Sequence, residues 1–157
     1  MYIDRMKKAR KFIANLHARK LRMMNWIVID YLPNGDVPAR KVLVEDSCGT
    51  TGCIAGWVQV MAGPQIHDYT HAPDFSRPYL GLKVKEADAL FMVQWPTFLF
   101  DKFEVTGDFS HDIETFDMLK PSVRKKAILK TLDYLIEYGF TWLQPSEQSN
   151  RVKQFGH

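Results

Sequence analysis

Four segments of the chain carry apolar residues at the three- and four-residue spacing of an amphipathic helix. They are residues 4–21, 53–61, 83–92 and 121–138. In the first segment, one face is formed by Met6, Ala9, Ile13 and Leu16. Pro121 begins the last segment and Gly139 follows it, which are the positions that Pro and Gly favour around a helix. The pattern predicts about four helices.

Two shorter segments, residues 25–31 and 40–45, are rich in the β-branched and aromatic residues that strands prefer. Asn34-Gly35 lies between them, and this pair favours a tight hairpin turn. We therefore expect one β-hairpin. Because an isolated two-stranded hairpin is marginal in water, it should pack on the helices.

The remaining segments complete a predicted fold of the α+β class. Residues 64–78 contain three prolines and predict a loop. Residues 93–119 are rich in aromatic residues and predict short helical turns over a core, since a structureless loop of that length is rare in a compact domain. The prediction is a mainly helical single domain over residues 1–144, with a flexible polar tail at 145–157.

Composition narrows the class of protein. With 157 residues, of which 46% are hydrophobic, the chain can form one domain with a real core. No apolar run approaches the roughly 20 residues of a membrane-spanning helix, and the first residues lack the pattern of a secretion signal. Two cysteines are too few for a disulfide framework. We expect a protein of the cytoplasm with reduced thiols.

The net charge of +3 is small, but the charges are grouped. Within residues 1–22 the basic residues are Arg5, Lys7, Lys8, Arg10, Lys11, Arg19, Lys20 and Arg22, against Asp4 alone. A second basic group consists of Lys120, Arg124, Lys125, Lys126 and Lys130, and residues 101–117 are acidic. Such asymmetry can mark a surface for a polyanion, or a solvated helix face whose charges the acidic segment balances. In the first case the candidate nucleic-acid contacts are Lys7, Lys8, Arg10 and Lys11, and the second basic group around Arg124, Lys125 and Lys126 could extend the same surface.

Both cysteines lie in one glycine-rich segment, residues 46–58, between the predicted hairpin and the second helix. Cys48 and Cys53, followed by His67 and His71, approximate the spacing of a structural zinc site. The alternative is that Cys53 faces the core, because free cysteine is among the most buried residue types. In that case Gly56 allows the second helix to pack closely against its neighbours.

A second chemical hypothesis is thiol catalysis. Cys53 begins a predicted helix, where open amides and the helix dipole would lower the thiol pKa. His71 or His111 could then act as the base of a nucleophile pair. The alternative is again a packed structural thiol, since the required pairing is spatial and cannot be read from spacing.

The run Cys48-Gly49-Thr50-Thr51-Gly52-Cys53-Ile54-Ala55-Gly56-Trp57 resembles a motif, Cys-Gly-Thr-x-x-Cys-(Ile/Leu)-Ala-Gly-(Trp/His), of small uncharacterised proteins encoded by tailed phages and bacterial genomes. The likeness continues through Leu80-Gly81-Leu82, Glu86–Phe91, Gly139 and Trp142. It covers residues 46–92 and the last helix. The resemblance implies a phage or mobile-element context and no particular activity.

Aromatic residues offer a third kind of site, because Trp and Tyr are frequent anchors at protein interfaces. The candidates are Tyr69, Phe75, Tyr79, Trp95 and Phe98, although most aromatic residues of a small domain are core. The leading hypothesis is a non-enzymatic phage-type accessory protein, without a cofactor, that binds and modulates a host or defence protein in the bacterial cytoplasm. The alternative is a nucleic-acid-binding protein that uses the basic N-terminal helix, and a zinc- or thiol-dependent enzyme ranks third.

Overall fold

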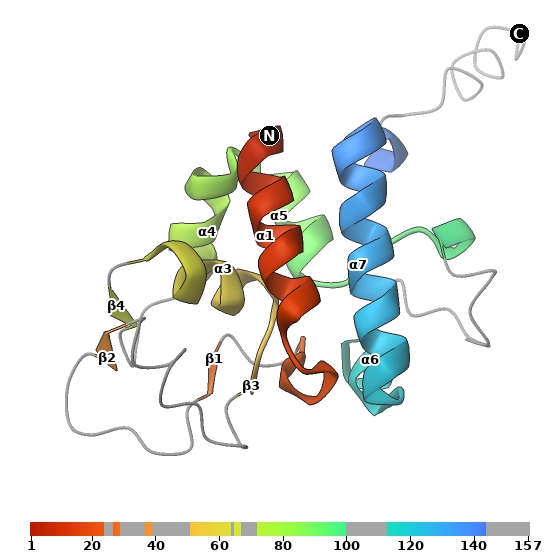
Figure 1. Ribbon diagram of the computed structural model, residues 1–157. Helices are drawn as coiled ribbons and strands as arrows, with labels where there is room; N and C mark the ends of the chain where they lie inside the picture. The colour runs from red at the N-terminus through yellow and green to blue at the C-terminus, as the bar shows by residue number, and fades with distance from the viewer. Residues whose placement is uncertain are drawn as a thin grey trace, which may run out of the picture.

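Helices make up most of the part of the chain that the computed structural model describes (Figure 1). The described residues are 1–23, 27–28, 37–38, 51–63, 65–66, 72–99 and 113–143. Within them lie six α-helices: α1 (Ile3–Asn15), α3 (Ile54–Ala62), α4 (Ala72–Leu80), α5 (Val84–Phe91), α6 (Ile113–Met118) and α7 (Pro121–Tyr138). Three short 3₁₀ helices accompany them: η1 (Ala18–Lys20), η2 (Thr97–Leu99) and η3 (Thr141–Leu143). The mainly helical single domain is confirmed, with six α-helices where about four were expected.

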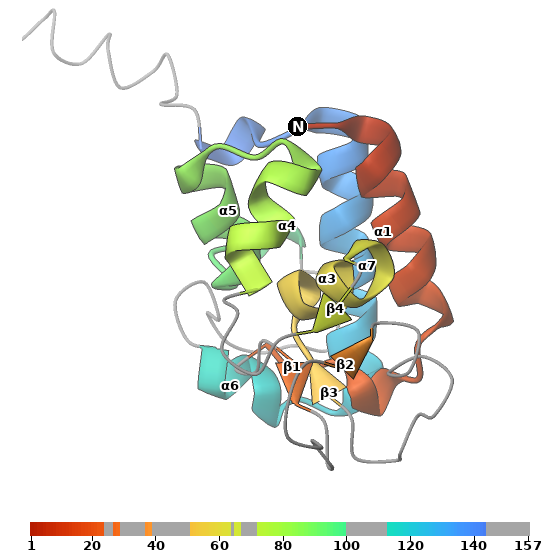
Figure 2. The ribbon, with the colours of Figure 1, turned by 90° about the vertical axis from the view of Figure 1, so that its left-hand side faces the viewer.

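Helix α1 packs against α7 on one side and against α3 and α4 on the other (Figures 1 and 2). Its buried residues are Met6, Ala9 and Ile13, as the sequence pattern predicts. Arg10 donates from Nε and Nη2 to the two carboxylate oxygens of Asp133, at 2.8 and 3.0 Å. Lys125 Nζ donates to the carbonyl oxygen of Leu16 at 2.6 Å. Later residues of α1 thus meet earlier residues of α7, so the two helices run antiparallel.

Helix α3 lies at the centre of the core and is buried from Ile54 to Val60. Apart from Gln59, the residues of α3 are apolar on every side of the helix, which is typical of a fully buried helix. The indole Nε1 of Trp57 donates to the carbonyl oxygen of Lys20 at 3.0 Å and fixes α3 to η1. The Ser76 hydroxyl donates to the carbonyl oxygen of Ala55 at 2.6 Å and fixes α3 to α4.

The described strands are two residues long. Strand β1 (Ile27–Val28) pairs antiparallel with β3 (Thr51–Gly52), with Ile27 opposite Gly52. Strand β2 (Val37–Pro38) pairs antiparallel with β4 (Gln65–Ile66). The expected return strand at 40–45 and the Asn34-Gly35 turn lie outside the described residues, as does the tail at 145–157. The hairpin and the tail therefore stay predictions.

Helix α4 corrects the expectation of a loop for residues 72–78, while residues 64 and 67–71 lie outside the described residues. Pro73 lies in its first turn, where a missing N–H costs no hydrogen bond. The helix ends at Leu80 and is followed by Gly81, which has a φ of +65°. The Gly81 and Leu82 N–H groups donate back to the carbonyl oxygens of Pro78 and Arg77, a Schellman ending. The three prolines of this segment led to the prediction of a loop, but Pro78 lies inside the helix.

The first helix is also shorter than predicted, because α1 ends at Asn15 rather than continuing to residue 21. Leu16 is extended, and the His17 imidazole accepts the Arg19 N–H at 3.3 Å to begin η1. The short helical turns expected between residues 93 and 119 are confirmed in the described part by η2 and α6. None of the described helices has the length and apolar character needed to span a membrane.

Candidate functional site

Of the cysteine and histidine candidates, Cys53 is the one that lies within the described residues. Its side chain is completely buried at the start of α3, and its Sγ accepts the Gly56 N–H at 3.4 Å. Burial raises the pKa of the thiol to about 12 and outweighs the backbone N–H groups that favour the thiolate. A thiol with this pKa stays protonated near neutral pH and is a poor nucleophile. The structure thus favours the packed thiol over the activated one.

The other candidates of both chemical hypotheses, Cys48, His67, His71 and His111, lie outside the described residues. Within the residues that the structure does describe, no three His, Cys, Asp or Glu side chains are grouped as metal ligands would be. The zinc site and the histidine base therefore stay predictions.

The four basic candidates of α1 are not equivalent. Lys7, Lys8 and Lys11 are exposed on the outer face of the helix. Arg10 is turned toward α7, and its hydrogen bond to Asp133 raises the pKa of its guanidinium. Arg10 therefore joins α1 to α7, while the three lysines remain free to meet solvent or a ligand.

Arg124 corrects the interpretation of the second basic group as a surface cluster. It is only 3% exposed. Its Nε donates to the carbonyl oxygen of Leu21 at 3.0 Å, and its Nη1 donates to those of Asp117 and Leu119, both at 2.7 Å. Burial lowers the pKa of Arg124, while the Asp117 carboxylate opposes that shift. An arginine remains charged under these conditions, so this is a buried cation held by backbone oxygens.

Trp95 is a second correction, because it is 1% exposed and cannot anchor a partner at the surface. Its Nε1 donates to the carbonyl oxygen of Leu90 at 3.1 Å, and its ring meets Phe116 edge-on with centroids 5.2 Å apart. Tyr69 lies outside the described residues. Of the aromatic candidates, Phe98 is the one that the structure leaves mostly exposed, at 52%.

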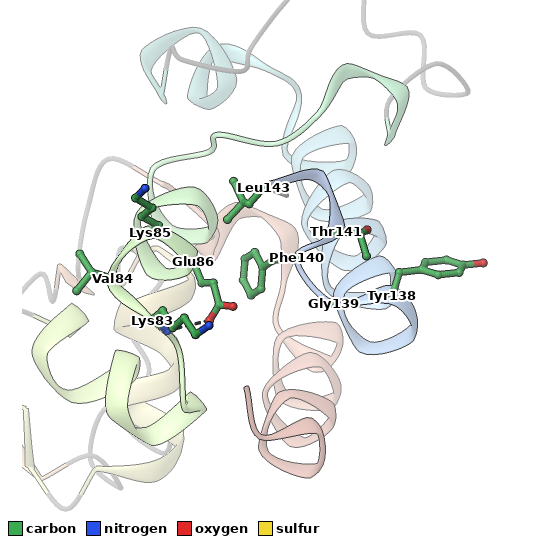
Figure 3. A pocket seen from close by; sticks show the side chains of 9 residues that line it. All are labelled: Lys83, Val84, Lys85, Glu86, Tyr138, Gly139, Phe140, Thr141 and Leu143. Carbon is green, nitrogen blue, oxygen red and sulfur yellow. Dashed lines mark hydrogen bonds between the residues drawn. The ribbon is translucent and has the colours of Figure 1, made fainter. Parts of the chain in front are cut away.

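A cavity of about 470 Å³ opens between the start of α5 and the end of α7 (Figure 3). Its lining residues are Lys83, Val84, Lys85, Glu86, Tyr138, Gly139, Phe140, Thr141 and Leu143. This volume lies within the range of small-molecule and cofactor pockets, about 300–1,000 Å³. The sequence patterns predicted the two helix ends but not the cavity between them, because such patterns do not show which helix ends lie close together in space.

The cavity has an apolar floor and a basic rim. The Phe140 and Leu143 side chains lie across from α5 (Figure 3). The Glu86 carboxylate accepts the N–H of Lys83 at 2.8 Å and thus caps its own helix. The Lys83 and Lys85 side chains are exposed. Two ammonium groups beside an apolar floor suit the binding of an acidic and apolar ligand.

The cavity continues into exposed apolar side chains. Val84 is 62% exposed, Tyr138 54% and Leu143 40%. In Figure 3 the Tyr138 ring points away from the cavity, so it widens the apolar surface rather than filling the hollow. The sequence gives no signal for this surface, because Val84 is in helical phase with the buried Ala87 and Phe91, and its exposure follows from its place in the first turn of α5.

Comparisons of the chain with protein-family models, with curated proteins and with solved structures found no match.

Proposed function

We propose that the chain is a non-enzymatic accessory protein of phage type that binds and modulates a host or defence protein in the bacterial cytoplasm. The phage context rests on the resemblance of the Cys48–Trp57 run. The observation that carries the binding role is the cavity between α5 and α7, whose lining includes the exposed apolar residues Val84 and Leu143. Exposed apolar side chains gathered around a hollow typically mark an interaction surface.

The chemistry of the rim defines the proposed partner segment. Lys83 and Lys85 carry positive charge at the mouth, and Glu86 is engaged by the backbone of its own helix. The segment that fits would place one apolar side chain against Phe140 and Leu143 and one carboxylate near the lysines. We infer a short acidic and apolar segment of the partner protein, held by a buried apolar anchor with a charged rim.

The thiol alternative receives less support than binding does. The burial of Cys53 and its pKa of about 12 remove the property that a catalytic cysteine needs. The cavity differs in this respect, because Val84, Tyr138 and Leu143 of its lining are exposed to solvent.

The test compares two charge-introducing variants at exposed apolar residues. Val84→Glu places a carboxylate at the cavity mouth, in the first turn of α5, where an acidic residue suits the helix dipole. Met118→Glu is the matched control, because Met118 is 85% exposed at the end of α6, away from the cavity. Both proteins should fold as the parent does, since surface substitutions change stability by about 0.5 kcal/mol or less.

The assay is capture from nuclease-treated bacterial lysate at moderate salt, followed by titration of the purified partner. We expect one protein to bind the parent chain and the Met118→Glu variant. Val84→Glu should weaken that binding by about 30-fold, the effect of losing an interface contact worth roughly 2 kcal/mol. Equal binding by Val84→Glu and the parent, or equal loss in Met118→Glu, would contradict the assignment of the cavity. A partner released by nuclease would contradict protein binding itself.

A further inference from the structure

The two basic groups of the sequence, about a hundred residues apart, meet at one end of the molecule. Lys125 donates to the carbonyl oxygen of Leu16, directly before η1. Arg124 donates to that of Leu21, directly after η1. The structure thus places η1 beside the first turns of α7, at the end of α7 opposite the cavity (Figures 1 and 2).

Four side chains at this end are exposed, positive and without an ion-pair partner among the described residues. They are Arg19, Arg22, Lys120 and Lys126, and we call them the basic end. The contrast with Arg10 is direct, because Arg10 has the Asp133 carboxylate at 2.8 Å. The buried cation of Arg124 lies among them, and the positive charge of Arg22 acts on its pKa.

The positive charges of the basic end also destabilise the N-terminus of α7. The first turn of α7 contains no acidic residue, and Lys120 precedes it as the N-cap. The N-terminus of an 18-residue helix is its positive end, where anions stabilise and cations destabilise. A polyanion bound to the basic end would relieve this repulsion.

We propose that the basic end binds the phosphodiester backbone of duplex nucleic acid, independently of its sequence. The exposed side chains of the basic end are cationic. Among the exposed aromatic residues of the described chain, Tyr2 and Phe98 lie on other elements, and Tyr138 lies at the opposite end of α7. Proteins that hold single strands stack bases on aromatic side chains, whereas duplex binding without base readout needs only positive charges on phosphates. This surface is separate from the cavity and does not depend on the function proposed for it.

The test is fluorescence anisotropy of the full chain with a labelled 30-bp duplex DNA between 50 and 200 mM salt. About four phosphate contacts give a slope of log affinity against log salt of about −3.6, which is a loss of roughly 150-fold over this range. The triple variant Arg19→Gln, Arg22→Gln, Lys126→Gln should reduce the slope to about −0.9 and weaken binding strongly at 50 mM salt. Arg124 is left unchanged because the fold depends on it.

The matched control is the triple variant Lys7→Gln, Lys8→Gln, Lys11→Gln, which also removes three exposed positive charges, from the outer face of α1. We expect it to keep the slope of the parent within about one unit. An equal loss in this control would assign the polyanion contact to α1 and overturn the basic end. The proposal also fails if the parent does not bind the duplex at 50 mM salt, or if it binds only vesicles with 30% anionic lipid. Matching melting temperatures of both variants and the parent exclude unfolding as the cause.

Discussion

Arg124→Met is the substitution with the largest expected effect on stability. Methionine has a similar length and a good helix propensity, so the change removes the guanidinium and little else from α7. Three carbonyl oxygens then lose their donor, those of Leu21, Asp117 and Leu119. The Asp117 side chain, which is 7% exposed and accepts the Met23 N–H at 2.8 Å, also loses its neighbouring cation.

The magnitude follows from the cost of leaving such groups unpaired. A buried acceptor without a donor costs about 1–3 kcal/mol, and breaking a buried charge pair costs about 3–5 kcal/mol. Because the Leu119 carbonyl is only partly buried, the sum of three carbonyls is an upper limit. We expect a loss of about 3–5 kcal/mol in the free energy of unfolding. For a domain of this size that lowers Tm by roughly 6–20 °C.

Urea denaturation followed by circular dichroism measures the loss, and thermal unfolding gives the shift in Tm. Lys126→Met is the control, since it removes an exposed positive charge two residues further along α7 and should stay within about 0.5 kcal/mol. Arg124→Lys should recover only part of the stability, because one ammonium group cannot reproduce the fork of donors. A loss below about 1 kcal/mol in Arg124→Met would refute the role of Arg124 as the joint between η1, α6 and α7.

Four further predictions concern single sites. Between pH 9 and about 12, native Cys53 keeps the proton that the unfolded chain loses, so the free energy of unfolding falls as the pH rises through this range. The Cys53→Ala variant should show a smaller decline. Parallel curves of unfolding free energy against pH for the variant and the parent would contradict the burial of the thiol. The buried Gln59 side-chain oxygen has no hydrogen-bond partner among the described residues, so Gln59→Met should stabilise by about 1 kcal/mol in urea denaturation, and a clear loss would show a missed contact. Gly139→Ala should cost about 1–3 kcal/mol, because Gly139 has φ +66° and ψ −160° although open space surrounds the added methyl group, and an unchanged Tm would contradict this. Gly81→Ala should also cost about 1–3 kcal/mol, because Gly81 has a φ of +65°; the exposed Tyr2 ring, 2.7 Å from the added methyl group, can move aside.

Sequence patterns predicted the helices with a clear apolar stripe and failed where tertiary contacts decide. The bounds of α7 were predicted because Pro121 and Gly139 mark both ends. Helix α4 was missed because its Schellman ending and its packing on α3 outweigh its prolines. For Cys53 the helix start suggested a lowered pKa, but the core around α3 raises it instead, and burial depends on neighbours that no local pattern names.

For Arg124, the helical pattern predicts a buried position, whereas the residue type predicts an exposed one. Residues 124, 128, 131 and 135 follow one another at intervals of four, three and four, and all four are buried. The helical period therefore placed Arg124 in the core stripe, while its charge suggested the surface. A charged residue in that position is stable only if hydrogen-bond partners meet it. Here the partners are main-chain oxygens, which every residue has, so no sequence signal could identify them. A basic residue in phase with an apolar stripe should be interpreted as a buried residue that holds neighbouring elements together. Only the basic residues out of phase with the stripe, such as Lys126, should be counted toward a binding surface.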